Sequence, residues 1–283
     1  MLNQLFQIGD FIFRLVCNDD ITIPRHFMKF KTENVQESYT YTIEINGRFP
    51  EPAGKLIVSR PDLLIYQTEV GETRYIGIKG INDFYGYYRE VYNTHAEILV
   101  SPNYLDLFYS DPVFNSLLAL ERHLIDYDSF VLHCAYMRYK SKAILFSAPS
   151  ETGKTTQANL WGQYRGGETI NGDKGLLQKV NDTWMVKGWP VCGSSDICMN
   201  EETPIQAIVM LSQGKSNTVE RLAPSRAFIQ IYSQITINRW NAVHTTKAVE
   251  MLEKLVSEVP VYHLSCTISK EAVECLEAAL FQF

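Results

Sequence analysis

Several features that mark other classes of protein are missing from this chain. None of its six cysteines forms a C-x-x-C pair, so neither a zinc knuckle nor a dithiol redox motif is expected. No run of about 18 apolar residues occurs, so we expect no membrane-spanning helix. The net charge is -6, and this lack of basic excess argues against a general nucleic-acid binder. The chain also has no internal repeat and no low-complexity tract.

The N-terminal segment MLNQLFQIGDFIFRLV lacks the pattern of a secretory signal. Such a signal has a basic start followed by an uninterrupted apolar core, and this segment has neither. The cysteines are scattered through apolar segments, which is typical of reduced thiols in a cytosolic protein. We therefore expect a cytoplasmic protein whose partners are neither membranes nor nucleic acids.

The chain has 283 residues, of which 46% are hydrophobic, enough for one large domain or two smaller ones. Residues 1–110 contain β-branched and aromatic segments such as YTYTIEI and DLLIYQTEV, separated by Gly, Pro and Asn. This pattern predicts an N-terminal antiparallel β-rich domain. Its many tyrosines favour cross-strand aromatic pairs over the alternative, a surface that stacks against a ligand.

The pattern changes at Asp111-Pro112, which is a typical helix start. Apolar residues then recur at helical spacing, so we expect one linking helix over residues 111–127. From Ser129 onward, short apolar strands such as FVLHCAYM and KAILFSA are followed by amphipathic segments such as TTKAVEMLEKLVSEV. We therefore expect a second domain of the α/β (α+β) class over residues 111–283, built on a mixed sheet.

The segment AILFSAPSETGKTT, Ala143 to Thr156, is typical of a phosphate-binding P-loop. Such a loop works because backbone N–H groups at a helix start surround phosphate oxygens. The strict pattern G-x-x-x-x-G-K-[ST] occurs here with Ala148 in place of its first glycine, a mild change where φ is negative. We expect phosphate groups of a nucleotide to contact the residues that follow: Ser150, Glu151, Thr152, Gly153, Lys154, Thr155 and Thr156.

Two further residues, Asp173 and His133, belong to the hypothesis of a phosphate site. Lys154 would reach the outer phosphates and Thr155 would hold Mg²⁺, which also needs a carboxylate at a nearby strand end. Asp173, in TINGDKGLL, is at such a position, although alone it would be an ordinary turn aspartate. His133 lies in an apolar strand, where a histidine is by itself more typical of a packed core than of catalysis.

Taken together, these segments resemble the kinase core of the HPr kinase/phosphorylase group, which is itself similar to the nucleotide-binding half of ATP-dependent phosphoenolpyruvate carboxykinase. The shared order is a strand histidine, a hairpin, a strand, the P-loop, a helix and an acidic strand end. The resemblance covers about residues 129–283 and extends to HPr-kinase-related proteins that phosphorylate a serine on a precursor peptide. It implies ATP and Mg²⁺ as cofactors, Thr155 and Asp173 as metal ligands, and catalytic roles for Asp173, His133 and Lys154.

This sequence departs from that group at one point. Its protein kinases usually carry two adjacent aspartates, whereas Asp173 here stands alone between Gly172 and Lys174. In those kinases one aspartate helps to bind the metal and the other acts as the base. Here either Asp173 does both, or His133 is the base, or the reaction needs no strong base. The segment KGWPVCGSSD is either a plain polar loop or the acceptor side of the site, in which case the lining residues are Cys192, Gly193, Ser194, Ser195 and Asp196.

The function expected from these residues and this resemblance is an ATP-dependent kinase. Its preferred acceptor is the hydroxyl of a serine on a small protein or a ribosomal precursor peptide, and residues 1–110 would bind that acceptor. Two alternatives stay open at this point. One is a kinase for a small metabolite, and the other is a nucleotide-responsive binding protein with little catalysis.

Overall fold

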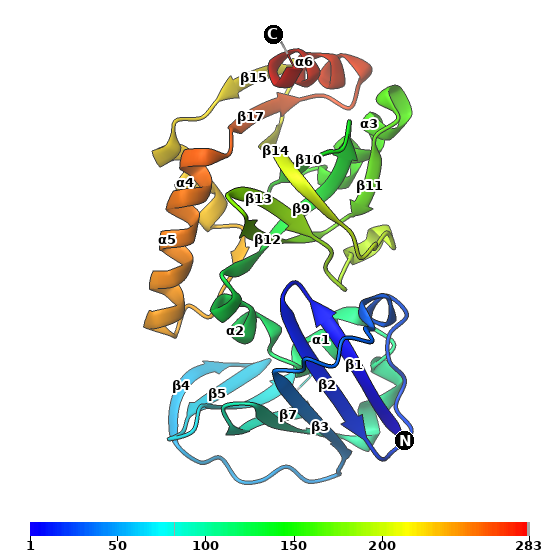
Figure 1. The fold of residues 1–283 in the computed structure, drawn as a ribbon, viewed down its shortest axis with the longest axis vertical. Helices are drawn as coiled ribbons and strands as arrows, with labels where there is room; N and C mark the ends of the chain where they lie inside the picture. Colours follow the sequence, from blue (N-terminus) through cyan, green and yellow to red (C-terminus); the bar gives the residue numbers. More distant parts are fainter. Residues whose placement is uncertain (82, 282–283) are drawn as a thin grey trace. The chain divides into compact units, whose positions relative to one another are not determined.

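The structure is a computed structural model that describes residues 1–81 and 83–281 (Figure 1). The chain forms two compact units, Met1–His123 and Leu124–Phe283. Each unit is built on its own mixed sheet, so the expected combination of strands and helices is confirmed at the level of the α/β class. Among the described residues, no helix is both long enough and apolar enough to span a bilayer.

The first unit contains an eight-stranded sheet in the order β1-β2-β3-β8-β7-β6-β5-β4. Strands β2–β3 and β3–β8 pair in parallel, and all other neighbours are antiparallel. The expectation of an antiparallel sheet is therefore wrong in part, because a long connection returns the chain to the start of β2 before β3 begins. The strands are β1 Leu2–Ile8, β2 Phe11–Cys17, β3 Tyr39–Ile45, β4 Lys55–Arg60, β5 Leu63–Gln67, β6 Glu72–Gly77, β7 Phe84–Tyr92 and β8 His95–Val100.

Short helices complete this unit, and they replace the single linking helix expected over residues 111–127. The segment is broken at Ala119, whose φ of 47° lies in the left-handed region and cannot continue a right-handed helix. Arg122 forms ion pairs with Glu72 and Glu90 of the sheet, which explains why the unit extends beyond residue 110 to His123. The helices are η1 Phe27–Phe30, η2 Pro102–Leu107, α1 Asp111–Leu117 and α2 Leu120–Leu124; η3 Ile125–Tyr127 opens the second unit.

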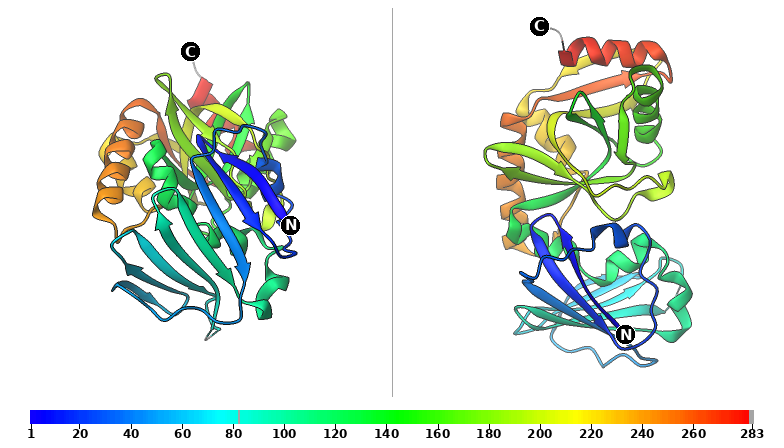
Figure 2. Two further views of the ribbon diagram at one scale, coloured as in Figure 1. Left: turned by 60° about the horizontal axis from the view of Figure 1, so that its bottom comes forward. Right: turned by 45° about the vertical axis from the view of Figure 1, so that its right-hand side comes forward.

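The second unit contains a nine-stranded sheet (Figure 2). Its main order is β10-β9-β12-β13-β14-β17-β15, while β11 and β16 also pair with β9 and β10 also pairs with β14 in parallel. The strands are β9 Ser129–Tyr139, β10 Lys142–Ser147, β11 Glu168–Asn171, β12 Lys174–Val180, β13 Thr183–Lys187, β14 Glu202–Gln213, β15 Thr218–Arg221, β16 Ile235–Thr236 and β17 Val261–Cys266.

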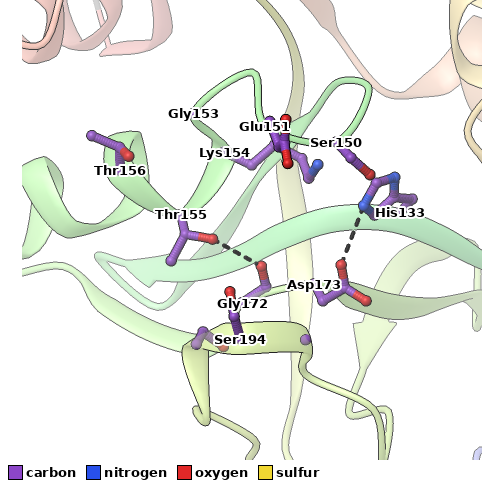
Figure 3. Close-up of a pocket in the computed structure, with 12 residues that line it drawn as sticks. His133, Ser150, Glu151, Gly153, Lys154, Thr155, Thr156, Gly172, Asp173 and Ser194 are labelled. Carbon is purple, nitrogen blue, oxygen red and sulfur yellow. Dashed lines mark hydrogen bonds and ion pairs between the residues drawn. The ribbon is translucent and has the colours of Figure 1, made fainter. Parts of the chain in front are cut away.

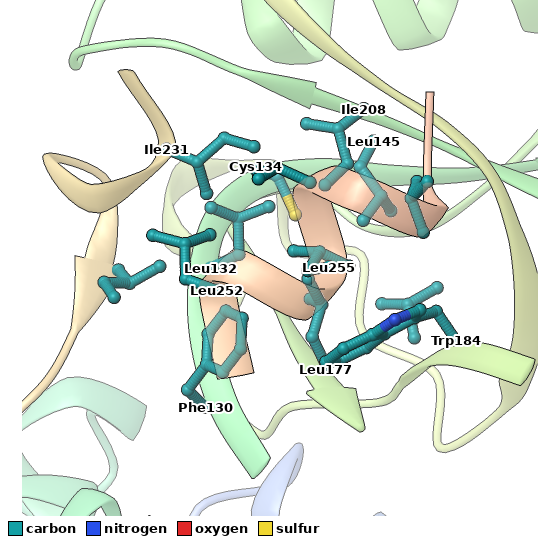
Figure 4. Close-up of a cluster of buried hydrophobic side chains, with 14 of the residues drawn as sticks. Phe130, Leu132, Cys134, Leu145, Leu177, Trp184, Ile208, Ile231, Leu252 and Leu255 are labelled. Atoms are coloured by element: carbon teal, nitrogen blue, oxygen red, sulfur yellow. The ribbon is translucent and has the colours of Figure 1, made fainter. Parts of the chain in front are cut away.

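Helices bury apolar side chains against this sheet in two clusters. The larger cluster joins β9, β12 and β13 to α4 Pro224–Tyr232 and α5 Ala242–Glu258, and Figure 4 shows Phe130, Leu177 and Leu252 within it. The smaller cluster joins β10 to α3 Lys154–Arg165 and α6 Lys270–Phe281. These clusters fix the strand ends and the start of α3, from which the polar side chains described below project.

Candidate functional site

The P-loop segment connects β10 to α3, as its sequence predicts (Figure 3). Gly153 is the residue before α3 and has a φ of 110°, a conformation that favours glycine. Ala148 is buried in the smaller apolar cluster and does not adopt a positive φ, so alanine fits there without strain. The missing first glycine therefore leaves the strand, loop and helix arrangement intact.

Lys154, the first residue of α3, is a buried cation. Its side chain is 7% exposed, and Nζ donates hydrogen bonds to the carbonyl oxygens of Ala148 (3.1 Å) and Pro149 (3.2 Å). Within the described part of the chain it has no ion pair with a carboxylate. Burial lowers the pKa of Lys154, and the nearby Asp173 only partly offsets this effect. The fold thus holds a positive charge that its own carboxylates do not neutralise.

Asn171, the last residue of β11, organises the turn that carries Asp173. Its Oδ1 accepts hydrogen bonds from the backbone N–H groups of Asp173 and Lys174, both at 2.9 Å. Its Nδ2 donates to the carbonyl oxygens of Trp189 (2.8 Å) and Val191 (3.2 Å). One fully buried amide therefore fixes two segments at once. The Asn-Gly-Asp sequence predicts a turn, but the hydrogen bonds from Asn171 to the segment after β13 are not predictable from the sequence.

Asp173 and His133 meet because of strand register. His133 in β9 is paired with Lys174 in β12, which places the preceding residue beside the histidine. The Nε2 atom of His133 lies 3.2 Å from Oδ1 of Asp173. Burial raises the pKa of Asp173, but the hydrogen bond from His133 and the charges of Lys174 and Lys154 outweigh it, so the pKa is lowered overall. His133 thus lies at the site and not only in the core.

Thr155 approaches the same turn from α3. Its Oγ1 donates a hydrogen bond to the carbonyl oxygen of Gly172 at 3.1 Å. Gly172 also packs closely on Ser195, since a Cβ at position 172 would lie 2.1 Å from the Ser195 hydroxyl oxygen. Ser195 is itself held by donating to the carbonyl oxygen of Cys192 at 2.7 Å. Gly172 therefore allows the segment after β13 to lie against the Asp173 turn.

These groups surround a cavity of about 360 Å³, hereafter the phosphate cavity. It contains most of the site residues expected from sequence and adds Gly172. Thr152 does not line it; its hydroxyl donates to the carbonyl oxygen of Pro149. Cys192 and Asp196 do not line it either, and Cys192 is buried. The lining residues are His133, Ser150, Glu151, Gly153, Lys154, Thr155, Thr156, Gly172, Asp173, Gly193, Ser194 and Ser195.

A second cavity, of about 530 Å³, shares Glu151, Gly153 and Thr156 with the first. It is hereafter the side cavity, and Thr152 lies here. Sequence reasoning did not identify it, because its walls come from the start of α3 and the ends of β14 and β17, which meet only in the folded sheet. The remaining lining residues are Gln157, Gln213, Gly214, Cys266, Thr267 and Ile268.

The chemistry of the phosphate cavity suits an anion together with a hard cation. A helix start and the buried ammonium group of Lys154 favour an anion such as phosphate. The hydroxyl of Thr155 and the carboxylate of Asp173 are oxygen ligands of the kind that Mg²⁺ prefers. Because the low pKa of Asp173 keeps it ionised at neutral pH, this donor set fits Mg²⁺.

Comparison with known proteins identifies the family. A family model described as "SynChlorMet cassette protein ScmC" matches residues 112–281, which is more than half of the chain. The chain belongs to this family. No curated protein matches the sequence. Among solved structures, the chain is similar to the Hpr(Ser) kinase/phosphatase from Coxiella burnetii, with 7% identity, a TM-score of 0.33, and coverage of 53% of this chain and 95% of that chain.

The resemblance to the HPr kinase group is therefore supported only in part. The matching family model is a different one, and the structural likeness to an HPr kinase is weak. At this level of similarity the likeness carries no argument about activity, so the function has to rest on the geometry of the site itself.

Proposed function

We propose that this protein is an ATP- and Mg²⁺-dependent kinase that transfers the γ-phosphoryl group to a hydroxyl. The observation that carries the proposal is Lys154, a buried cation at the start of α3. Its hydrogen-bond partners within the described chain are neutral carbonyls, and it lines a cavity with Asp173 and His133. A phosphate group would supply the negative charge that the described carboxylates do not. The side cavity, which shares loop residues with the phosphate cavity and has a volume of about 530 Å³, has room for the nucleoside.

Each residue has a role in this proposal. Backbone N–H groups of residues 150–156 and the Lys154 ammonium group bind and orient the phosphates. Thr155 and Asp173 would hold Mg²⁺, which when bound neutralises charge on the phosphates. The low pKa of Asp173 makes it a weak proton acceptor, which supports a role in metal binding over a role as the base.

His133 is then the candidate for handling the hydroxyl proton. An ionised carboxylate can only accept a hydrogen bond, so the contact with Asp173 places the proton of neutral His133 on Nε2. Nδ1 is left as the acceptor nitrogen. Phosphoryl transfer depends mainly on positioning and charge stabilisation, so one modest base is enough.

The preferred acceptor is a serine on a small protein or a precursor peptide. Gly193 and Ser194 are exposed at the edge of the phosphate cavity, so an extended chain could approach there without displacing buried groups. The six cysteines are free, which agrees with a reducing compartment such as the cytoplasm. A small-metabolite acceptor is the alternative within the same chemistry.

The test is ATP turnover by the wild type and by Lys154→Ala, with and without a candidate serine peptide. The proposal predicts acceptor-dependent turnover and a phosphoserine detectable by mass spectrometry, both lost in Lys154→Ala. Wild-type turnover no higher than that of Lys154→Ala, whatever the acceptor, would overturn the proposed kinase function. Tight nucleotide binding without turnover would instead support the alternative function, a nucleotide-responsive binding protein. The single carboxylate at Asp173 favours this alternative, because the second aspartate of the related kinases is missing.

A further inference from the structure

Ser194 is an exposed serine that lines the phosphate cavity and has no role in the proposed chemistry so far. It lies in η4 Gly193–Ser195, a short helix in the segment after β13. Among the described residues, none forms a hydrogen bond with its hydroxyl. By contrast, the hydroxyls of Ser195 and Thr155 in the same cavity both donate to backbone carbonyl oxygens. The Ser194 hydroxyl is therefore available for chemistry.

The segment that carries this serine is fixed against the end of β11. Asn171 and Cys198 form an isolated β-bridge. The backbone N–H of Met199 donates to the carbonyl oxygen of Ile170 at 2.9 Å. Both contacts follow η4 within a few residues along the chain, so they hold Ser194 at the cavity.

Gly193 brings the same segment into contact with Asp173. A Cβ at position 193 would lie 3.1 Å from Cβ and 3.4 Å from Oδ1 of Asp173. That Oδ1 atom is also the one that lies 3.2 Å from Nε2 of His133. Consecutive Cα atoms are about 3.8 Å apart, so Ser194 begins one residue away from this contact. Its hydroxyl is within reach of a phosphate whose Mg²⁺ is held by Asp173.

Ser194 belongs to a different wall of the cavity from the phosphate-binding residues (Figure 3). Lys154 and the loop before it connect β10 to α3, whereas Ser194 follows β13. In phosphoryl transfer the attacking and leaving oxygens lie roughly in line, on opposite sides of the phosphorus. A hydroxyl from another wall suits the attacking position better than those of Ser150 and Thr156, which belong to the loop and the helix start themselves.

We infer that Ser194 is a modification site, which accepts the γ-phosphoryl group of ATP bound to the same chain. A bond forms between Oγ of Ser194 and the γ-phosphorus, and the bond from this phosphorus to the bridging oxygen breaks. Its electron pair leaves with ADP, and the hydroxyl proton passes to the base that serves any other acceptor. The inference rests on the proposed function, because it uses the same ATP. The product adds negative charge beside Asp173, which disfavours binding of further ATP and limits the reaction to one transfer.

The test is incubation of the full chain with ATP and Mg²⁺, without peptide, followed by intact-mass and tandem mass spectrometry. We expect up to one phosphate per chain, located on Ser194. Ser194→Ala should lose it, and Ser194→Thr, which keeps a hydroxyl, should be phosphorylated at the same position. Ser233→Ala, which removes an exposed serine outside the phosphate cavity, should be modified like the wild type. The Ser194 side chain is exposed and unbonded, so its variants should fold.

Mixing the wild type with Lys154→Ala distinguishes transfer within one chain from transfer between chains. The two chains differ in mass, so each is measured separately, and only the wild type should gain phosphate. Phosphate on the Lys154→Ala chain, or on a residue of the wild type other than Ser194, would overturn the inference. If the wild type phosphorylates a serine peptide while its own chain stays unmodified, only this inference fails. If neither peptide nor chain gains phosphate, the proposed function fails with it.

Discussion

Two buried cations, one in each unit, are held in opposite ways. Arg74 in the first unit is 4% exposed and donates to Glu72 at 2.8 Å and to Glu121 at 2.7 Å. Burial alone would lower the pKa of Arg74, but these two carboxylates raise it above its usual range. Among the residues that the structure describes, Lys154 in the second unit has only neutral carbonyl partners, and its pKa is lowered.

This difference in partners distinguishes Arg74, whose charge stabilises the fold, from Lys154, whose charge is available to bind a ligand. In the first unit, buried charges are matched within the fold, and they attach α2 to the sheet. In the second unit, a positive charge is kept out of water without a full counter-charge, an arrangement that weakens the free protein and strengthens binding of an anion. The predictions below test this contrast, from the largest expected effect to the smallest.

Arg74→Met should destabilise the protein strongly, because it leaves the buried Glu72 and the partly buried Glu121 without this partner. Breaking a buried pair typically costs about 3–5 kcal/mol. The free energy of unfolding measured in urea should show this loss. Arg89→Met, on the neighbouring strand, removes an arginine that is 46% exposed and paired with Glu97. It should cost less than about 1 kcal/mol. Equal losses for the two variants would contradict the structural role of Arg74.

Asp173→Asn should lower phosphoryl transfer by about 100-fold, with only a small loss in the free energy of unfolding. The amide keeps the size of the side chain but removes the charge that would hold Mg²⁺, and losses of this order are typical when one charge-stabilising group is removed from an active site. Turnover measured across a range of Mg²⁺ concentrations should show a raised requirement for the ion. A variant with wild-type turnover and Mg²⁺ dependence would exclude Asp173 as the metal ligand.

Lys154→Met should leave the free energy of unfolding unchanged or slightly raised. Because burial lowers the pKa of Lys154, the folded protein disfavours its charge, and an apolar side chain of similar length removes that cost. Thermal and urea unfolding without nucleotide would measure the effect. A loss as large as that in Arg74→Met would show that Lys154 is a structural cation like Arg74.

The smallest effect concerns pH. The pKa of Asp173 is lowered in the folded state, so the stability it contributes is present above its ordinary value of 3.8 and is lost as pH falls through the folded value. The difference in unfolding free energy between the wild type and Asp173→Asn should therefore shrink as pH falls below about 4. A difference that persists unchanged at the lowest pH at which both proteins are folded would contradict a lowered pKa of Asp173.

The sequence predicted those parts of the site that depend on neighbours along the chain. The apolar strand, the Gly-Lys-Thr segment and the helix after it are local patterns, and all three are confirmed in the structure. The meeting of His133 with Asp173 depends on the register between β9 and β12, which only the resemblance suggested. The hydrogen bond from Nε2 of Gln157 to the carbonyl oxygen of Thr267 joins residues more than a hundred positions apart, and no local pattern predicts it.

The fold shows the same limit. Strand segments such as Tyr39–Ile45 were readable from their alternating and β-branched residues, but their parallel pairing was not, since it depends on how a long connection returns. The break at Ala119, which has a left-handed conformation, has no glycine or proline to signal it.

The central claim is that Lys154 is held ready for a nucleotide phosphate, and the affinity for ATP tests it most directly. Titration calorimetry of Mg²⁺–ATP into the wild type and into Lys154→Met would compare the two chains, with circular dichroism to establish that both are folded. The account predicts saturable binding at one site in the wild type and a loss of about 100-fold or more in the variant, as expected when one partner of a buried charge pair is removed. Equal affinity in the two chains, or no binding by the folded wild type, would contradict it.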